Sequence, residues 1–269
     1  PKCFATTKRF IEGGDWLVWK LCDREMRSAC QAGYKGLWDI KEGYPSLSFL
    51  EKLSKGFGEI KDKLSCKVYP TGTCAGRLTS GMASKLSLLP GIPVSTSIID
   101  AHAALAGSGI AVPGKMLMAM GTSTCHIMIS KKEVFMEGIA GVVKDGVLPG
   151  YYGYESGQSA VGDIFAWVVN YGVPESYHIE SKKLGISLHE LLIRKNTYQT
   201  AKGCELIALD WLNGNRSVLM NSNLNGLLIG LTLNTKPEDI YRAMIEATAF
   251  GTKIIINGYE ESGVKIKEL

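Results

Sequence analysis

The sequence predicts an α/β fold, and three neighbouring features of its 269 residues indicate it. The run Val94–Ile99 is rich in β-branched residues and predicts a buried strand that ends at Asp100. The segment Ala101–Gly109 follows with small residues and predicts a helix that packs close to a neighbour. Farther along, Met116–Ile129 predicts a hairpin of two apolar strands. A strand, a helix and further strands in this order are typical of an α/β domain.

Composition and charge exclude two classes of function. Hydrophobic residues make up 45% and charged residues 21%, which is typical of a soluble globular protein that can bury a sizeable core. The net charge is only +4 and the basic residues are dispersed, whereas a nucleic-acid groove needs clustered Lys and Arg. No apolar run approaches the ~20 residues of a membrane span. We therefore expect neither a nucleic acid nor a membrane as a partner.

The cysteines indicate the cellular compartment, and the two ends of the sequence indicate whether it is part of a longer protein. The seven cysteines show no Cys-x-x-Cys spacing and no His neighbours that would suggest a zinc site, so we expect no metal-ligating residues. With no visible signal peptide, a reducing cytoplasm is the expected location. The chain opens on Pro1, and Val264–Leu269 predicts a strand that has only begun. We expect a piece of a longer protein.

Apolar residues at helical spacing predict the helices of the first third. The first begins near Asp15, its expected N-cap, and ends at Leu21. Three more are expected over or within the segments Tyr44–Leu53, Gly56–Val68 and Leu78–Leu88.

The segment Ser28–Trp38 predicts a loop near a cleft, because glycines flank Tyr34 and Lys35. A lysine in such a loop can donate hydrogen bonds to sugar hydroxyls or stabilise negative charge. An isolated lysine is otherwise a solvated surface residue, and the segment alone leaves both readings open.

Asp100 offers a carboxylate between a predicted strand and a predicted helix, which is where open α/β sheets place their ligands. A carboxylate there can accept a proton from a hydroxyl as a general base. The same position is also common for a helix N-cap. His102 follows two residues later, and we favour a core or interface histidine over a substrate ligand.

The turn Gly121-Thr122-Ser123-Thr124 offers backbone N–H groups, one glycine for close approach and three hydroxyls. This combination suits phosphate oxygens, although such a turn can equally be only a turn. A base beside a phosphate cradle predicts phosphoryl transfer to an alcohol.

The segment Pro149–Gln158 predicts a loop that leads into a helix over Ser159–Tyr171. Its tyrosines, hydroxyls and the carboxylate of Glu155 are residue types that bind a polyol. A structural tyrosine corner is the competing reading.

The last third predicts mainly helices and short strands. Val173–Gly203 predicts polar helices, Gly203–Leu212 a strand or short helix, and Leu227–Leu233 a strand. Thr235 and Glu238 predict a capping box at the start of a long helix over Pro237–Asn257.

Several motifs in order make the chain resemble the FGGY family of carbohydrate kinases. They include Ile99-Asp-Ala-His-Ala103, Met118-Ala-Met-Gly-Thr-Ser-Thr124 and Gly153-Tyr-Glu-Ser-Gly-Gln-Ser159. Further matches are Arg9-Phe-Ile-Glu-Gly-Gly-Asp-Trp16 and Asn223-Leu-Asn-Gly-Leu-Leu-Ile-Gly-Leu231, so the resemblance covers nearly the whole chain. Within the family, the pattern is most similar to members that phosphorylate L-ribulose.

The resemblance implies an actin-like, ribonuclease-H-like fold of two domains with the active site between them. Residues 1–110 would form the C-terminal part of the first, sugar-binding domain, and residues 111–269 the N-terminal part of the second, nucleotide-side domain. The implied activity is ATP-dependent phosphorylation of a ketopentose, L-ribulose to L-ribulose 5-phosphate, as in L-arabinose catabolism. ATP and Mg²⁺ are the implied cofactors, and a homodimer stays open.

The resemblance also assigns roles to single residues. Asp100 would be the catalytic base, and Lys35 and Glu155 would join it in binding the sugar. Gly121, Thr122 and Ser123 would bind phosphate.

Two family elements are missing from the chain. No Asp-x-Gly-Thr of the N-terminal phosphate hairpin appears, and the adenosine-binding glycine pair would follow the strand begun at Val264. We therefore expect an incomplete ATP site in this polypeptide. The alternatives are a family kinase for another ketose or polyol, such as xylulose or glycerol, and a non-catalytic sugar-binding module. A hydrolase built on Asp100 lacks a plausible nucleophile or metal partner.

Overall fold

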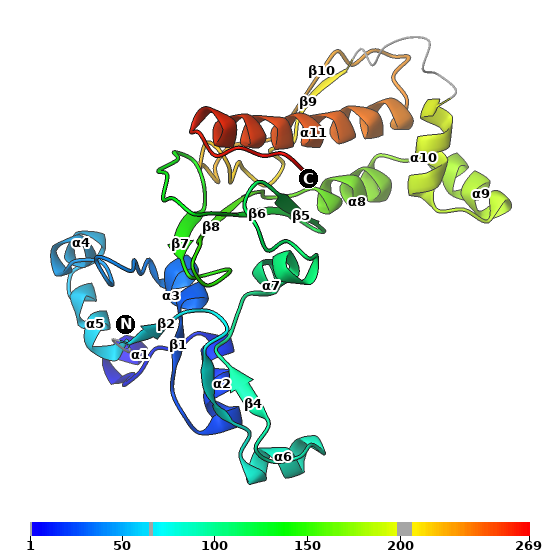
Figure 1. Ribbon diagram of the computed structural model, residues 1–269. Coiled ribbons are helices and arrows are strands. Elements are labelled where there is room, and N and C mark those ends of the chain that lie inside the picture. The colour runs from blue at the N-terminus through cyan, green and yellow to red at the C-terminus, as the bar shows by residue number, and fades with distance from the viewer. Residues whose placement is uncertain (1, 65–66, 198–205) are drawn as a thin grey trace.

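The chain folds into an N-terminal half of short helices and small sheets and a C-terminal half built on one larger sheet. The computed structural model describes residues 2–64, 67–197 and 206–269. In Figure 1 the N-terminal half, drawn in blue and cyan, lies below the green four-stranded sheet, and the long red helix α11 crosses above that sheet. None of the helices in the described ranges combines the length and apolar character needed to cross a bilayer.

The N-terminal half contains two small sheets, each of two strands. Strand β1 (Arg27–Ser28) pairs in parallel with β2 (Val68–Tyr69), and β3 (Cys74–Arg77) pairs antiparallel with β4 (Pro93–Ser95). Around them lie short helices, namely α1 (Lys2–Thr6), α2 (Gly13–Cys22), α3 (Ala29–Gly36), α4 (Leu47–Leu53), the 3₁₀ turn η1 (Phe57–Glu59), α5 (Ile60–Lys63) and α6 (Ser80–Leu86).

The C-terminal half is organised around an antiparallel sheet with the strand order β5-β6-β8-β7. Its strands are β5 (Met116–Met120), β6 (Thr124–Ser130), β7 (Gly141–Lys144) and β8 (Tyr152–Gln158). Because side chains alternate between the faces of a strand, Ile127 and Ile129 pack with Leu105 of helix α7 (Asp100–Gly107). Met128 points to the other face, where it packs with Tyr259 of α11 (Pro237–Glu261). The sheet is therefore covered on both sides.

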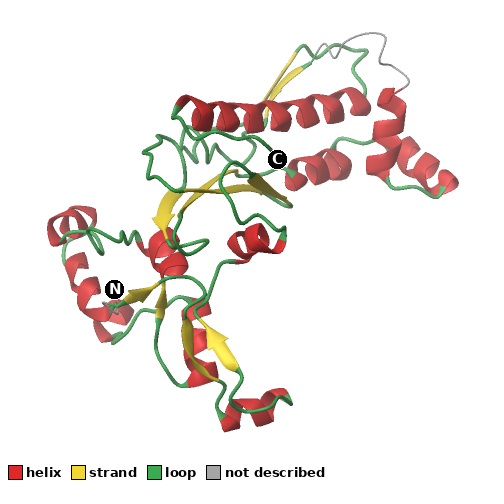
Figure 2. Ribbon diagram, viewed as in Figure 1, coloured by secondary structure: helices red, strands yellow, loops and turns green. Residues whose placement is uncertain are grey.

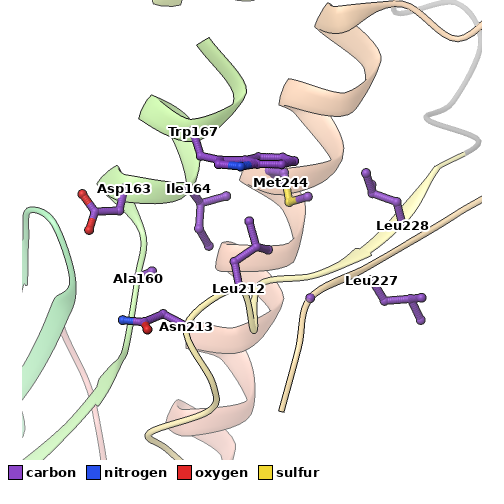
Figure 3. Close-up of a pocket in the computed structure, with 10 residues that line it drawn as sticks. Ala160, Asp163, Ile164, Trp167, Leu212, Asn213, Leu227, Leu228 and Met244 are labelled. Atoms are coloured by element: carbon purple, nitrogen blue, oxygen red, sulfur yellow. The ribbon is translucent and has the colours of Figure 1, made fainter. Parts of the chain in front are cut away.

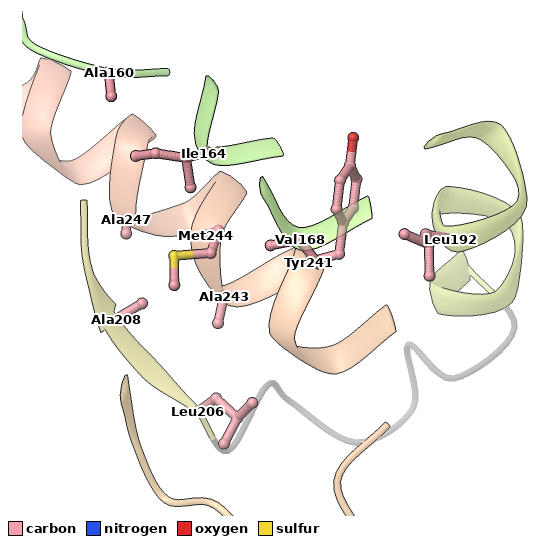
Figure 4. Close-up of a cluster of buried hydrophobic side chains, with 10 residues drawn as sticks. All are labelled: Ala160, Ile164, Val168, Leu192, Leu206, Ala208, Tyr241, Ala243, Met244 and Ala247. Carbon is pink, nitrogen blue, oxygen red and sulfur yellow. The ribbon is translucent and has the colours of Figure 1, made fainter. Parts of the chain in front are cut away.

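The remaining C-terminal elements lie beside α11, and Figure 2 draws their helices in red and their two strands in yellow. They are α8 (Gly162–Tyr171), α9 (Glu175–Leu184), α10 (Leu188–Thr197), β9 (Ile207–Leu209) and β10 (Leu227–Ile229), and the two strands pair antiparallel. Figure 4 shows their shared core, in which Ile164 and Val168 of α8 meet Met244 of α11. This core fixes the start of α8, which is the part of these elements closest to the predicted phosphate turn.

The predicted hairpin and long helix are confirmed, whereas the predicted buried strand Val94–Ile99 is wrong. The observed strand β4 is short and stops at Ser95, and Val94 is only half-buried. After Ser95 one more backbone bond follows, from the Thr96 N–H to the Thr73 carbonyl at 2.8 Å, and the side-chain hydroxyls bind other partners. The Thr96 hydroxyl donates to the Pro70 carbonyl at 3.1 Å, and the Ser97 hydroxyl donates to Asp15 at 2.5 Å. β-branched character predicted extended backbone here but not these side-chain bonds.

Two predicted loops, Ser28–Trp38 and Pro149–Gln158, are mostly regular structure instead. The first contains helix α3, which Ser28 caps by accepting a hydrogen bond from the Cys30 N–H at 3.1 Å. The second contains strand β8. Their glycines permit close packing: a Cβ added to Gly33 would lie 2.4 Å from Val143 Cγ1. The glycines that suggested loops therefore let α3 lie directly against the sheet.

Two predicted helix caps are also wrong. Asp15 is not an N-cap but lies inside the first turn of α2, where it is buried and accepts the Ser28 N–H at 3.2 Å. Helix α11 begins after Lys236, whose N–H donates to Asp239 at 2.9 Å. Glu238 instead turns inward and accepts a hydrogen bond from the Tyr177 hydroxyl at 2.7 Å. In both places a tertiary contact takes the carboxylate away from local capping.

The chain's last residues lie beside the sheet, next to β5. The Met116 N–H donates to the Glu268 carbonyl at 3.0 Å, and the Lys267 N–H donates to the Gly114 carbonyl at 2.7 Å. The predicted short strand from Val264 is thus limited to one parallel bridge between Lys115 and Glu268. Part of the predicted element Gly203–Leu212 falls outside the described residues, and β9 occupies the rest.

Candidate active site

Asp100 is the first residue of α7, and its side chain is exposed. Within the described chain its carboxylate accepts one hydrogen bond, from the N–H of the adjacent Ala101 at 2.8 Å. The helix N-cap is Ile99, so Asp100 does not cap α7 in the usual way. The carboxylate is held at a helix start and stays open to accept a proton.

The turn between β5 and β6 is exposed and keeps several donors free. The Gly121 N–H is occupied, because it donates to the Ser123 carbonyl at 2.9 Å. In contrast, the N–H and hydroxyl groups of Thr122 and Ser123 have no hydrogen-bond partner within the described residues. A Cβ added at Gly121 would find its nearest neighbour at 3.9 Å, so the glycine leaves open space beside the turn. The turn therefore offers the donors of Thr122 and Ser123, and its role as a phosphate cradle stays a prediction.

Helix α8 starts against this turn. The Val161 and Gly162 N–H groups donate to the Thr122 and Gly121 carbonyls at 2.8 and 3.0 Å. The approach requires glycine, since a Cβ on Gly162 would lie 2.5 Å from the Gly121 carbonyl oxygen. The first N–H groups of α8 are therefore used to hold the turn against the helix, while the donors of Thr122 and Ser123 stay free.

Glu155 lies on β8, with only 13% of its side chain exposed. One carboxylate oxygen is paired with the Arg216 guanidinium, and the other lies 3.1 Å from Nε2 of His102. Burial by itself would raise the pKa of this carboxyl, but the neighbouring His102 and the Arg216 charge outweigh it, so the pKa lies below its usual value. Glu155 is therefore a carboxylate at neutral pH.

His102 is fully buried in α7 and joins Glu155 to Cys30 of α3. Its Nδ1 lies 3.2 Å from the Cys30 Sγ, and the Tyr34 ring packs against the imidazole with centroids 4.2 Å apart. The predicted core histidine is confirmed. It also lies beside Glu155, which is predicted to bind the sugar. A role for His102 at the substrate site was the alternative that the sequence favoured less.

Lys35 lies in the last turn of α3 with an exposed side chain. Its ammonium makes no hydrogen bond or ion pair within the part of the chain that the structure describes. Cys30, near the start of α3, contacts His102 of α7 and the Ile99 N–H. These contacts fix the position of α3, and so of Lys35 at its end, relative to Asp100. The group is free to bind a ligand.

Shared packing and one arginine connect the elements that carry three of the four predicted site features. Ala101, next to Asp100, packs in one cluster with Cys125, which follows the phosphate turn on β6. Arg216 reaches from Glu155 to the Cys125 Sγ at 3.7 Å. The residues that neighbour Asp100 and the turn therefore share one cluster, and Arg216 joins Cys125 to Glu155; the roles of Asp100, the turn and Glu155 stay predictions.

A pocket of about 620 Å³ lies beside the phosphate turn, on the α8 side. Figure 3 shows Trp167 and Met244 along one wall and Leu212 across from them, with Asp163 at the edge near the start of α8. The Asp163 N–H lies 3.4 Å from the Thr122 carbonyl, so the pocket adjoins the turn. Its lining is mostly apolar with a few polar groups, which is the character of a small-molecule site.

Sequence reasoning missed Arg216 and Cys30. Arg216 stands in the glycine-rich segment Asn213-Gly-Asn-Arg216, whose only signal was a turn. Cys30 was counted as one of several unpaired thiols, and burial raises its pKa to about 12. Neither residue carries a motif of its own, because each acts through a contact with a residue far away in the sequence.

The C-terminal half matches a known family model, that of the FGGY family of carbohydrate kinases, C-terminal domain, over residues 116–269. The chain belongs to this family. Over its full length it is 48% identical to proteins named ribulokinase from Anoxybacillus flavithermus and Geobacillus thermodenitrificans, and 43% identical to one from Staphylococcus aureus. It covers 48% of each of the first two. The chain spans about half the length of the curated relatives it matches.

Solved structures of other family kinases have the same fold. A xylulose kinase from Rhodospirillum rubrum matches with a TM-score of 0.78 at 18% identity, over 100% of this chain and 51% of that one. A glycerol kinase from Plasmodium falciparum, solved with ADP, matches with a TM-score of 0.68 at 18% identity, over 94% of this chain and 47% of that one. The mixed α/β sugar kinase fold expected from the sequence is confirmed, as about half of a full-length family structure.

Proposed function

We propose that the protein containing this chain transfers the γ-phosphoryl group of ATP to L-ribulose. The single observation that carries the proposal is an exposed carboxylate, Asp100, at the start of a helix whose next residue, Ala101, packs against the same buried cluster as Cys125, which follows a turn with free donors. The sugar is supported by the identity to relatives named ribulokinase. The reaction needs a base for the attacking hydroxyl and donors for the transferred phosphoryl group, and these residues supply both.

The residues fit a nucleotide. The 620 Å³ pocket offers Trp167 and other apolar side chains to a base, and the free donors of Thr122 and Ser123 lie next to it for phosphate oxygens. In the described ranges no group of three or more His, Cys, Asp or Glu could hold a metal ion. This fits Mg²⁺ in phosphoryl transfer, which keeps water ligands and binds mainly through the nucleotide with one or two carboxylates. Asp163 at the pocket edge is such a carboxylate.

In this mechanism each residue of the chain has one task. Lys35 and Glu155 bind sugar hydroxyls, Lys35 as a donor and Glu155 as an acceptor. Asp100 takes the proton of the attacking hydroxyl. Thr122 and Ser123 donate hydrogen bonds to the oxygens of the phosphoryl group during its transfer, and Gly121 leaves room for this group to approach the turn. Mg²⁺ with ATP would neutralise charge on the phosphates.

The division of labour between the halves is part of the proposal. Residues 1–110 would belong to the sugar-binding domain and residues 111–269 to the nucleotide-side domain. The family model for the C-terminal domain begins at residue 116, which supports a boundary close to this one. A cytoplasmic location stays a prediction.

The test is an ADP-release assay with Mg-ATP on the full-length protein and on its Asp100→Asn variant, with L-ribulose, xylulose and glycerol as acceptors. Asn keeps the shape of Asp but cannot take the proton, so kcat should fall by about 10²- to 10⁴-fold while the sugar still binds. Near-normal turnover in the variant would refute the base assignment. A clear preference for xylulose or glycerol would replace L-ribulose, and no turnover with any acceptor would refute the kinase.

A further inference from the structure

A buried chain of side chains runs between the two halves of the protein. The Ile99 N–H donates to the Cys30 Sγ at 3.4 Å, and this Sγ lies 3.2 Å from Nδ1 of His102. Nε2 of His102 lies 3.1 Å from Glu155, which is paired in turn with Arg216. Cys30 and His102 are 0% and 1% exposed, so water does not compete for these contacts.

The groups leave one arrangement of protons for neutral His102. The Glu155 carboxylate is ionised and can only accept, so the Nε2 beside it must carry the hydrogen. Nδ1 is then the acceptor. Cys30, whose pKa is raised to about 12 by burial, keeps its S–H and donates to Nδ1, while its sulfur accepts the Ile99 N–H. Each partner thus fixes the tautomer and the ring orientation of the next.

We propose that His102 is a positioning residue, which holds the Glu155 carboxylate in one orientation for a sugar hydroxyl and is itself held by Cys30. This rests on the proposed function, because Glu155 is a sugar ligand only in that reaction. Nε2 of His102 makes no hydrogen bond with any described residue in this structure: it lies 3.1 Å from the carboxylate oxygen, but its hydrogen is not directed at that oxygen. Catalytic hydrogen bonds commonly tighten once substrate is bound.

The arrangement also ties the base to the sugar site. Ile99 directly precedes Asp100, and its N–H is bound to the same Cys30 that orients His102. A shift of Glu155 is therefore passed to the start of α7. Glu155 faces ionisable or polar side chains from every packed element, namely Cys30 and Tyr34 of α3, His102 of α7, Arg216 of the loop before β10, Cys125 of β6 and Tyr259 of α11.

The first experiment compares three variants of the full-length protein. His102→Leu removes the donor, and His102→Gln keeps an N–H at the position of Nε2. His126→Leu is the matched control for the kinetic comparison, because His126 is also fully buried but lies on the α11 face of the sheet, without a hydrogen-bond partner among the described residues.

The kinetic result expected is a change in sugar binding alone. His102→Leu should raise the sugar KM by about 10- to 100-fold, as for loss of a hydrogen bond to a charged group, and change kcat and the ATP KM by less than about threefold. The acid limb of kcat/KM should move to higher pH, because Glu155 loses a partner that favours its ionised form. His102→Gln should recover most of the sugar KM, and His126→Leu should match the wild type.

Three kinetic outcomes would overturn the positioning role. They are an unchanged sugar KM in His102→Leu, a His102→Gln variant as impaired as His102→Leu, or a similar loss in His126→Leu. A variant with higher ATP KM and sugar KM together would indicate general disorder of the fold and would count against the proposal as well.

A second measurement needs no turnover. The Glu155 pKa is lowered in the folded protein from an ordinary 4.5, so its partners stabilise the fold above that pH and lose this effect as the pH falls below it. The difference in Tm between the wild type and His102→Leu should therefore be largest near neutral pH and shrink below pH 4.5. His126→Leu is not a control for this trend, because burial lowers the pKa of His126 from 6.5 to about 4, and its removal alone changes the pH dependence of stability between these values. A pH-independent difference would overturn the contact between His102 and Glu155. If this trend appears but the wild type phosphorylates no sugar, the kinase function and the sugar role fail while the contact itself stands.

Discussion

Helix α3 can pack directly against β7 because Gly33 has no side chain, and we predict that adding one destabilises this contact. This glycine lies inside α3 and faces Val143 of β7, and a Cβ added to it would lie 2.4 and 2.6 Å from the two methyl carbons of Val143. Carbon atoms pack at about 3.5–4.0 Å, so Gly33→Ala must push the helix and the strand apart by about 1 Å. Val143 is only 5% exposed and cannot move aside into solvent.

The expected magnitude combines two opposite effects. Overpacking a well-filled core costs about 1–3 kcal/mol, and replacing Gly by Ala inside a helix returns about 1 kcal/mol. We therefore expect Gly33→Ala to destabilise the contact between α3 and β7 by about 1–2 kcal/mol. Because α3 carries both Cys30 and Lys35, the sugar KM should rise as well.

The assay is native-state hydrogen exchange of the α3 and β7 amides in the full-length protein, resolved by mass spectrometry, which reports local opening free energies. Val143→Ala removes the two methyl groups, and on its own it should cost about 2 kcal/mol. In the double variant the new Cβ occupies the vacated space, so the two losses should fail to add by about 1–3 kcal/mol. Gly258→Ala in α11 is the control, since no atom lies within 4 Å of its added Cβ, and it should not weaken α11. Strictly additive losses would refute the steric argument.

Two further predictions concern single charges. Lys35→Met should raise the sugar KM by about 10-fold or more with little change in the fold, because the exposed ammonium contacts nothing else among the described residues. Calorimetric titration with L-ribulose measures the affinity of the variant. An unaltered affinity would show that Lys35 does not bind the sugar. Asp15 has a pKa raised by burial from 3.8 to about 6, despite hydrogen bonds from Ser97 and Ser28 that lower it. In the unfolded chain Asp15 therefore loses its proton at a lower pH than in the folded protein. The free energy of unfolding should decrease by roughly 3 kcal/mol as the pH rises through this window, so the fold becomes less stable. Unfolding of wild type and Asp15→Asn between pH 4 and 7 tests this, and an equal pH slope in both would contradict it.

The sequence predicted the parts of the fold whose signals are local. The hairpin Met116–Ile129 and the helices near α4, α8 and α11 were read from periodicity and turn residues, and the structure confirms them. Elements decided by long-range contact were missed. Glycines predicted loops over Ser28–Trp38 and Pro149–Gln158, yet at Gly33 and Gly153 they make room for neighbouring side chains, which no pattern within one segment records.

The candidate site divides in the same way. Asp100 and the turn at Gly121–Ser123 were found because each has a residue pattern of its own. Arg216 and Cys30 were not, because an arginine in a turn and a buried cysteine gain meaning only from the Glu155 carboxylate and the His102 ring. Roles that a side chain plays through a distant partner are therefore the part of a site that a single sequence leaves undetermined.

The placement of Glu155 explains why such a network is needed. A carboxylate that binds a sugar must be ionised and shielded from bulk water, and burial alone would favour its neutral form. Two partners from different elements, His102 and Arg216, compensate for that cost and also fix both oxygens. Because one partner lies on α7 and the other in the loop before β10, the carboxylate is in place only when the two halves of the chain are docked. If Glu155 binds the sugar as proposed, docking of the two halves and sugar binding are coupled, so variants that loosen the packing of α3 or α7 should weaken sugar binding before they unfold the sheet.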